Sequence, residues 1–142
     1  MNEEKNISVS HLVKFLDINY QTFHSWINND VFGGKFKNIG RGKKREFGFD
    51  DVCAVLIAQN ILNITKSFEV TRNVVENFYK APDELKNGWN IFIYFDKELG
   101  PQISWMIKGF TIDNFHPKVV RSLVFIPVQI IREEVKIFFS TI

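Results

Sequence analysis

The chain has 142 residues, of which 45% are hydrophobic and 24% are charged, and its formal net charge is +2. This balance is typical of a folded globular protein, and the length suits one ordinary domain or two small ones. The only cysteine, Cys53, excludes an intrachain disulfide and a cysteine-based zinc site. No apolar run reaches the roughly 18 residues of a membrane span, and the N-terminus lacks the apolar region of a signal peptide. We therefore expect a cytoplasmic protein that makes no membrane contact.

Positive charge is concentrated in one short segment, residues 35–45, called the basic segment below. It holds six basic residues and no acidic one, whereas basic and acidic residues are equal in number from residue 67 to the end. A local cluster of this kind is typical of a surface that contacts nucleic acid. The six residues are Lys35, Lys37, Arg41, Lys43, Lys44 and Arg45.

The first two predicted helices are short and amphipathic. Apolar residues at positions 9, 12, 13 and 16 recur at helical spacing, which predicts a helix over residues 8–16 that Ser8 or Ser10 can cap. A second helix is expected over residues 20–29, with Asn19 as its cap and with Trp26 on its buried face. The opposite face carries only side chains that can form hydrogen bonds. They are Gln21, Thr22, His24, Ser25 and Asn28.

Glycines interrupt the next segment, residues 31–48, and short runs between them predict a hairpin rather than a helix. We assign Phe47, like Trp26, to the core. A third helix is expected from near Gly48 to about residue 63, because Asp50 and Asp51 would lie in its first turn, where negative charge is favourable. A further amphipathic helix is predicted over residues 68–80, and Pro82 follows its end.

The second half of the chain has a different pattern. Residues 83–88 predict a linker, and strands are expected over residues 89–95, 101–107 and 122–126. Pro127 is well placed to open a last helix over residues 128–140. The expected fold class is α+β, with a helical N-terminal domain over residues 1–66, a helix and linker over 67–88, and a small domain of about three strands and a terminal helix over 89–142.

Three motifs in the first 60 or so residues resemble the MerR family of winged helix-turn-helix regulators. The run from Thr22 to Trp26 is similar to the family's Thr-Leu-Arg-Tyr-Trp, although His24 and Ser25 replace the arginine and the tyrosine. Residues 42–47 look like the family's basic wing, and residues 48–52 look like the start of the helix that follows it. The resemblance implies a DNA-binding domain over about residues 6–66, with the long dimerisation helix of the family not evident.

Such a domain places its second helix in the major groove and its basic hairpin on the phosphate backbone. On that reading Gln21 is positioned for a bidentate contact with adenine. About half of the basic segment would neutralise phosphates, and the rest would be ordinary surface charge. The expected DNA-binding residues are Tyr20, Gln21, Thr22, His24, Ser25, Lys35, Lys37, Arg41, Lys43, Lys44 and Arg45.

Other chemistry has little support in the sequence. His11, His24 and His116 are too scattered for a helical metal site, and no nucleophile elbow, paired-carboxylate motif or dinucleotide fingerprint occurs. Cys53 is expected to be a buried apolar residue rather than a redox sensor. We therefore expect no enzyme activity, no metal and no cofactor.

The residues after 88 leave their role open. Their aromatic residues would form the core of a small sheet or line a ligand pocket, and the apolar residues of the last helix exceed what one buried face needs, which suggests a dimer interface. The leading hypothesis is a sequence-specific regulator that binds duplex DNA as a homodimer in the nucleoid, with an effector as a possible ligand of the C-terminal domain. The alternatives are a mobile-element architectural factor, of the excisionase-like or partition type, and a protein-interaction module.

Overall fold

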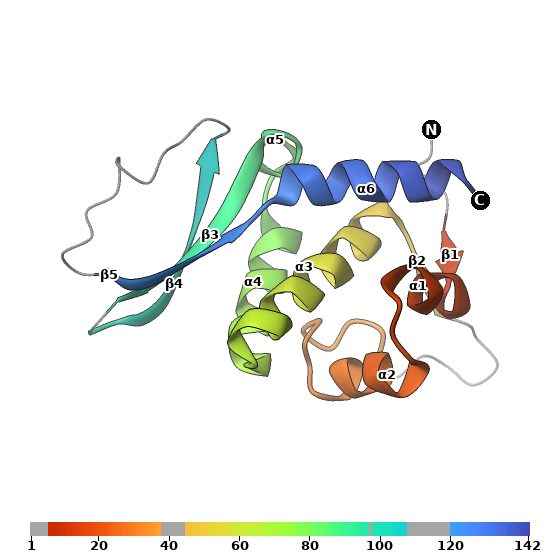
Figure 1. The fold of residues 1–142 in the computed structure, drawn as a ribbon, viewed down its shortest axis with the longest axis horizontal. Helices are drawn as coiled ribbons and strands as arrows, with labels where there is room; N and C mark the ends of the chain where they lie inside the picture. Colours follow the sequence, from red (N-terminus) through yellow and green to blue (C-terminus); the bar gives the residue numbers. More distant parts are fainter. Residues whose placement is uncertain (1–5, 38–44, 97, 108–119) are drawn as a thin grey trace. The chain divides into compact units, whose positions relative to one another are not determined.

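The computed structural model describes residues 6–37, 45–96, 98–107 and 120–142 (Figure 1). The described residues form six helices and two small antiparallel sheets, which confirms the α+β class. The chain divides into two compact units. The first unit comprises residues 1–80 and 131–142, and the second comprises residues 81–130. These boundaries differ from the predicted ones, because most of the last helix belongs to the first unit.

The first unit begins with strand β1 (Ile7–Ser8) and helix α1 (Val9–Leu16). Ser8 caps α1, because its side-chain oxygen accepts a hydrogen bond from the backbone N–H of His11 at 3.3 Å. A three-residue turn leads to helix α2 (Tyr20–Asn28), where Asn19 accepts from the backbone N–H of Thr22 at 2.7 Å. Both helices and both caps match the sequence prediction.

The hairpin predicted over residues 31–48 is not formed in its described part. Residues 29–36 make consecutive turns, and strand β2 (Glu46–Phe47) pairs antiparallel with β1 instead. Apolar side chains hold this turn segment, residues 29–36, against the core. Phe32 and Phe36 are buried and pack against Phe23 and Phe47 respectively. Residues 38–44, which contain the centre of the predicted wing, lie outside the described residues.

Helix α3 (Phe49–Thr65) is the central helix of the first unit. Nine of its residues, including an unbroken run from Val52 to Ala58, are buried. Its first turn is fixed by Asp51, whose carboxylate accepts a hydrogen bond from the backbone N–H of Gly48 at 3.0 Å. Helix α4 (Phe68–Lys80) lies beside it, with Val74, Val75 and Phe78 buried (Figure 1). The helix predicted over residues 68–80 is confirmed.

The last helix, α6 (Val128–Ser140), continues from the second unit into the first at Ile131. Its C-terminal part packs on the first unit through aromatic contacts, since Phe139 lies 5.8 Å from the ring of Phe49 and Phe138 stacks on Phe15 at 4.1 Å. Arg132 is buried and its guanidinium lies 3.2 Å from the carboxylate of Asp50. The fold of the first unit therefore includes the end of the chain.

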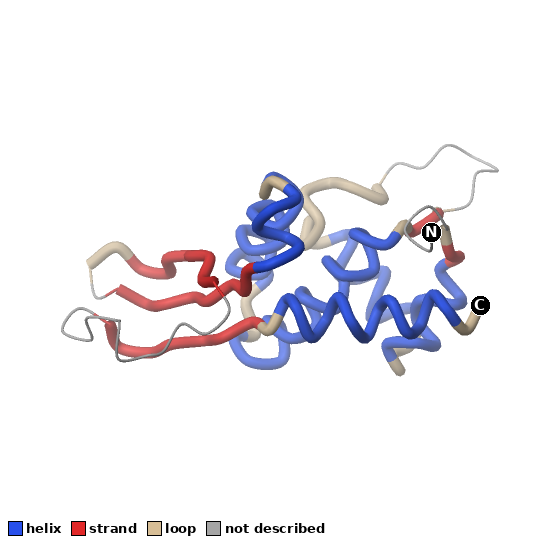
Figure 2. Tube along the Cα trace, turned by 90° about the horizontal axis from the view of Figure 1, so that it is seen from above, coloured by secondary structure: helices blue, strands red, loops and turns tan. Residues whose placement is uncertain are grey.

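The second unit is a three-stranded antiparallel sheet of order β4-β3-β5 (Figure 2). Its strands are β3 (Trp89–Asp96), β4 (Gly100–Ile107) and β5 (Val120–Ile126), close to the predicted ranges. The predicted linker over residues 83–88 is instead a short helix, α5 (Asp83–Gly88), which Pro82 precedes. Three consecutive residues of the central strand, Ile91 to Ile93, are buried, so both faces of β3 are covered at that point. No described helix combines the length and hydropathy that a membrane crossing requires.

Candidate nucleic-acid interface

Helix α2 separates its side chains into two faces. Phe23, Trp26 and Ile27 are buried, and Phe23 packs edge-on against both Trp26 and Phe47 at 6.2 Å and 5.6 Å. The assignment of Trp26 and Phe47 to the core is therefore confirmed. The other face is made of residues that can form hydrogen bonds, with Tyr20 46% exposed and Gln21 exposed. A rigid helix with this division can present polar side chains without losing its anchor.

A solvent-open hollow of about 330 Å³ lies on the exposed face of α2. The structure brings together four of the five residues predicted on this helix, and Thr22, which is half-buried, is not among the lining residues. Two further residues, Asn28 and Asn29, line the hollow but were not among the predicted DNA-binding residues. Asn28 follows Gln21 and Ser25 at helical spacing, so its position was readable from the sequence. The lining residues are Tyr20, Gln21, His24, Ser25, Asn28 and Asn29.

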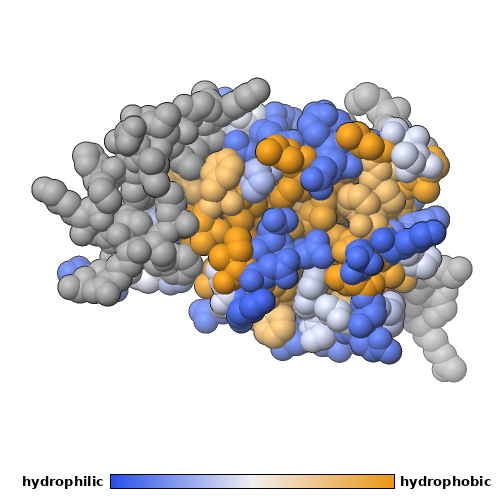
Figure 3. Space-filling view, in the orientation of Figure 1, coloured by the Kyte–Doolittle hydropathy of each residue, from blue (hydrophilic) through white to orange (hydrophobic). Residues whose placement is uncertain are grey.

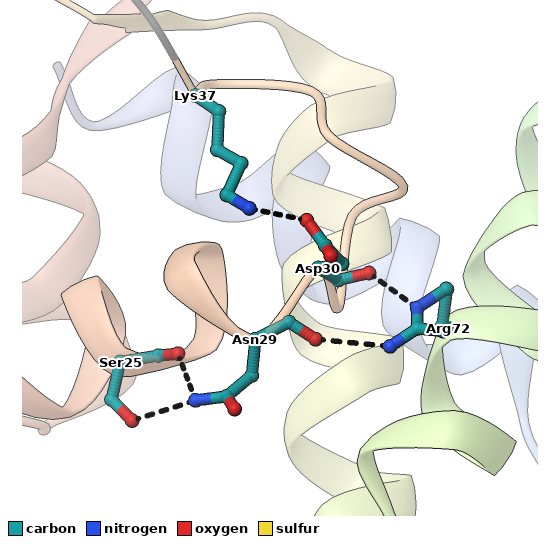
Figure 4. Close-up of polar contacts among 5 residues, drawn as sticks. All are labelled: Ser25, Asn29, Asp30, Lys37 and Arg72. Carbon is teal, nitrogen blue, oxygen red and sulfur yellow. Dashed lines mark hydrogen bonds and ion pairs between the residues drawn. The ribbon is translucent and has the colours of Figure 1, made fainter.

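Contacts within the hollow hold some of these side chains in place. The ring of His24 stacks on that of Tyr20 at 5.7 Å. The Asn29 side-chain amide donates to the backbone carbonyl of Ser25 at 2.8 Å and lies 3.4 Å from its hydroxyl (Figure 4). The Nδ1 atom of His24 is buried and has no hydrogen-bond partner among the described residues. Gln21 has no such restraint in the described contacts, which leaves its amide available to a ligand.

The two described lysines of the basic segment form ion pairs within the chain. The Lys35 ammonium lies 2.8 Å from the carboxylate of Asp51 and 4.2 Å from the centre of the Tyr79 ring. The Lys37 ammonium lies 2.6 Å from the carboxylate of Asp30, and this ammonium lowers the pKa of Asp30 below its usual value (Figure 4). The Lys35 contact connects the turn segment to α3, whereas the Lys37 contact links the two ends of that segment. Each ammonium therefore already has a carboxylate partner within the chain.

Arg45 connects the end of the basic segment to α2. Its Nε atom donates to the backbone carbonyl of Phe36 at 2.7 Å, and its Nη1 atom lies 3.5 Å from the hydroxyl of Tyr20. Arg45 therefore links Phe36 to the start of α2 and places a guanidinium beside Tyr20, one of the residues that line the hollow. The remaining predicted phosphate ligands, Arg41, Lys43 and Lys44, lie outside the described residues.

Asp51 is the centre of a small polar network that fixes the turn segment to α3 and α4. Besides Lys35, its carboxylate accepts a hydrogen bond from the hydroxyl of Tyr79 at 2.7 Å and from the backbone of Gly48. Burial and the nearby Asp51 carboxylate raise the pKa of Tyr79, so this hydroxyl stays protonated and donating. The network explains why a lysine of the basic segment has a structural role.

The described residues form no cluster suited to hold a metal ion. No group of three or more histidine, cysteine, aspartate or glutamate side chains is positioned to hold a metal ion within that part of the chain. Cys53 is fully buried in α3, and burial raises the pKa of its thiol to about 12. This confirms the prediction of a buried apolar cysteine, since such a thiol is unsuited to redox sensing.

Most of the apolar residues of α6 that were considered for a dimer interface are covered within the fold. Ile131, Val135 and Phe139 are buried, and Phe138 is covered by Phe15. Two of the six apolar residues considered for a dimer interface remain largely exposed, Ile130 at 61% and Ile137 at 65%. Figure 3 shows orange apolar patches separated by blue hydrophilic side chains along α6 rather than one continuous surface. The six residues considered were Ile130, Ile131, Val135, Ile137, Phe138 and Phe139.

The aromatic residues of the second unit are divided between core and surface. Phe92 is buried, whereas Trp89, Tyr94 and Trp105 are half-buried. Phe110, which the sequence places with them as a pocket or core residue, lies outside the described residues. Of the two alternatives for these aromatic residues, core or pocket, burial of Phe92 supports the core.

Comparison with known proteins adds no family to these observations. The chain matches no protein-family model, and no curated protein matches it in sequence.

Proposed function

We propose that the first unit binds duplex DNA, with α2 as the recognition helix in the major groove, and that the protein is a sequence-specific transcriptional regulator. The observation that carries this proposal is the exposed face of α2. Its hollow is lined by amide, hydroxyl, phenol and imidazole groups, and no lysine, arginine, aspartate or glutamate is among the lining residues. Such groups read the hydrogen-bonding edges of bases, whereas a phosphate-binding surface would be basic.

The anchoring of α2 supports the same role. Base readout requires that a helix keep its position when it enters the groove, and α2 is held by the buried side chains of Phe23, Trp26 and Ile27 and by its Asn19 cap. Gln21 is the residue best suited to a base contact, because it is exposed and an amide can pair bidentately with adenine. The resemblance to MerR-type regulators adds the expectation of a wing on the adjacent phosphates.

The ion pairs of the basic segment change how many phosphates we expect it to neutralise. Lys35, Lys37 and Arg45 have partners inside the protein. Three of the six basic residues, Arg41, Lys43 and Lys44, therefore remain as candidates for phosphate contacts. Three neutralised phosphates predict that log K falls with log salt at a slope of about −2.7 per protomer.

Matched charge removals test this assignment. Lys43→Gln should make the salt slope shallower by about 0.9 per protomer. Lys37→Gln removes the same charge from the same segment, but its ammonium pairs with Asp30, so the slope should change by less than about 0.3. Fluorescence anisotropy with a labelled duplex over a series of salt concentrations measures both. Equal changes for the two variants would show that Lys37 contacts DNA and that the division is wrong.

Selection of bound sequences from random duplexes tests the function itself. A regulator should enrich one motif, and paired half-sites about one helical turn apart would indicate a dimer. Tandem cooperative protection in a footprint would favour the architectural alternative. Failure to bind any duplex at low salt would overturn DNA binding and favour the interaction module. Mass measurement in solution tests the proposed homodimer, for which Ile130 and Ile137 are the exposed apolar residues of α6.

A further inference from the structure

The C-terminal end of α2 is held by an arginine that comes from another helix. Arg72 of α4 donates from Nε to the backbone carbonyl of Asp30 at 2.9 Å and from Nη2 to the backbone carbonyl of Asn29 at 3.2 Å. Figure 4 shows the guanidinium facing both carbonyls from the side opposite Ser25. Two donors of one planar group therefore fix two consecutive peptide units.

These two carbonyls lie at the point where α2 stops. Asn29 is the C-cap, and Asp30 adopts the left-handed conformation with φ of 58°. The last carbonyls of a helix lack partners within the helix and carry partial negative charge, which favours a cation beside them. The last turn of α2 contains no basic residue of its own. Arg72, more than 40 residues further along the chain, supplies that cation.

The same peptide units adjoin the hollow on α2. Asn29 lines it, and the Asn29 side chain reaches back to Ser25, which also lines it. On the other side, Lys37 pairs with the Asp30 carboxylate, so the turn after α2 is held from two directions. A rotation of this end of α2 would move Ser25, Asn28 and Asn29 together relative to any ligand of the exposed face.

We propose that Arg72 is a positioning residue that sets the orientation of the recognition helix and thereby the sequence discrimination of the protein. This inference rests on the proposed function. Base contacts require accurate placement of donors and acceptors, whereas long basic side chains tolerate small shifts relative to phosphates. Loss of the two-point contact should therefore reduce discrimination between sequences much more than it reduces affinity for unrelated DNA.

The experiment compares Arg72→Gln, Arg72→Lys and the control Lys80→Gln. The control removes one positive charge from an exposed position on the same helix. For each folded protein, affinities are measured for the selected duplex and for a scrambled duplex. In Arg72→Gln the ratio of the two affinities should fall about tenfold while the affinity for scrambled DNA changes less than about twofold. Arg72→Lys, which keeps the charge but not the planar fork, should recover only part of the ratio. Lys80→Gln should leave it unchanged.

Hydrogen exchange provides a readout that does not depend on DNA. The backbone N–H groups of Asn29 and Val31 donate to the carbonyls of Ser25 and Trp26 at 3.0 Å and 3.1 Å. Their exchange should become about tenfold faster in Arg72→Gln, with the amides of α3 unaffected.

The outcomes separate the two proposals. A wild-type protein that discriminates between duplexes, with an Arg72→Gln variant that discriminates equally well, overturns the role of Arg72 alone. Unchanged exchange at Asn29 and Val31 also overturns it, whatever the binding result. A wild-type protein that binds no duplex overturns the proposed function and the discrimination that Arg72 would control. Full recovery by Arg72→Lys would show that charge alone acts, and would overturn the two-point positioning.

Discussion

Helices α2 and α3 belong to the same unit but distribute their side chains in opposite ways. In α3 the residues from Val52 to Ala58 are buried without interruption, so the helix is covered on every side. In α2 three of nine residues are buried, and the remaining face is open and polar. Because α3 provides the core, α2 needs only one apolar face to stay in position. The exposed face of α2 is therefore free to carry chemistry that stability does not require.

The largest effect should come from removing a core contact in α3. Ile57 is fully buried, and Ile57→Ala should lower the free energy of unfolding by about 2–5 kcal/mol, because it removes buried methyl groups and leaves a cavity. Asn63→Ala, at an exposed position on the same helix, should change it by less than about 0.5 kcal/mol. Urea unfolding measures both values. A cost below about 1 kcal/mol for Ile57→Ala would contradict the core role of α3.

A smaller effect is expected at the start of α2. Asn19→Ala removes the side-chain oxygen that accepts from the backbone of Thr22, and should cost about 1 kcal/mol of unfolding free energy. Asn28→Ala, on the exposed face of the same helix, should cost less than about 0.5 kcal/mol. Equal losses in urea unfolding would mean that the cap is not what holds α2.

On the exposed face, stability and binding should separate. Gln21→Ala should change the free energy of unfolding by less than about 0.5 kcal/mol, because Gln21 is exposed. It should nevertheless lower discrimination at one base pair of the selected duplex by about 1–3 kcal/mol. Competition binding with duplexes changed one base pair at a time measures the second effect. A uniform loss across all duplexes would reassign Gln21 from base readout to backbone contact.

The smallest effect concerns the half-buried ion pair of Asp30 and Lys37. The Lys37 ammonium lowers the pKa of Asp30, so the pair contributes stability above the unfolded carboxyl pKa of about 3.9 and loses it as pH falls through the lowered folded pKa. Between pH 6 and pH 3 the wild type should therefore lose slightly more stability than Asp30→Asn, since asparagine also tolerates the left-handed conformation. Urea unfolding at both pH values, with Lys37→Gln as a second variant, measures the difference. Identical pH dependence in all three proteins would show that the ion pair has no energetic weight.

Local signals in the sequence located most helices and strands. Ser8 and Asn19 cap the helices they were predicted to cap, and α4 and α6 have the expected limits. These signals act within a few residues, so the sequence contains them directly. The helix α5 was missed because six residues show no apolar periodicity, although Pro82 and two acidic residues in its first turn were a readable signal.

The turn segment shows where local reasoning failed. Glycines between residues 31 and 48 are compatible with a hairpin, but burial of Val31, Phe32 and Phe36 ties the described part of this segment into turns against the core. The strand that follows pairs with Ile7–Ser8, which a hairpin prediction could not anticipate because the partner lies about 40 residues away. Long-range pairing depends on which surfaces the whole unit leaves available.

The sequence alone determined which residues of α2 are polar and which are apolar, and therefore which face a ligand can meet. It also located the single dense cluster of positive charge. Only the tertiary structure decided what those charges contact, because ion pairs such as Lys35 with Asp51 join residues that are far apart in the chain. It likewise assigned most of α6 to the first unit and brought Arg72 to the end of α2. An amphipathic pattern states that a face must be covered, whereas only packing decides which part of the chain covers it.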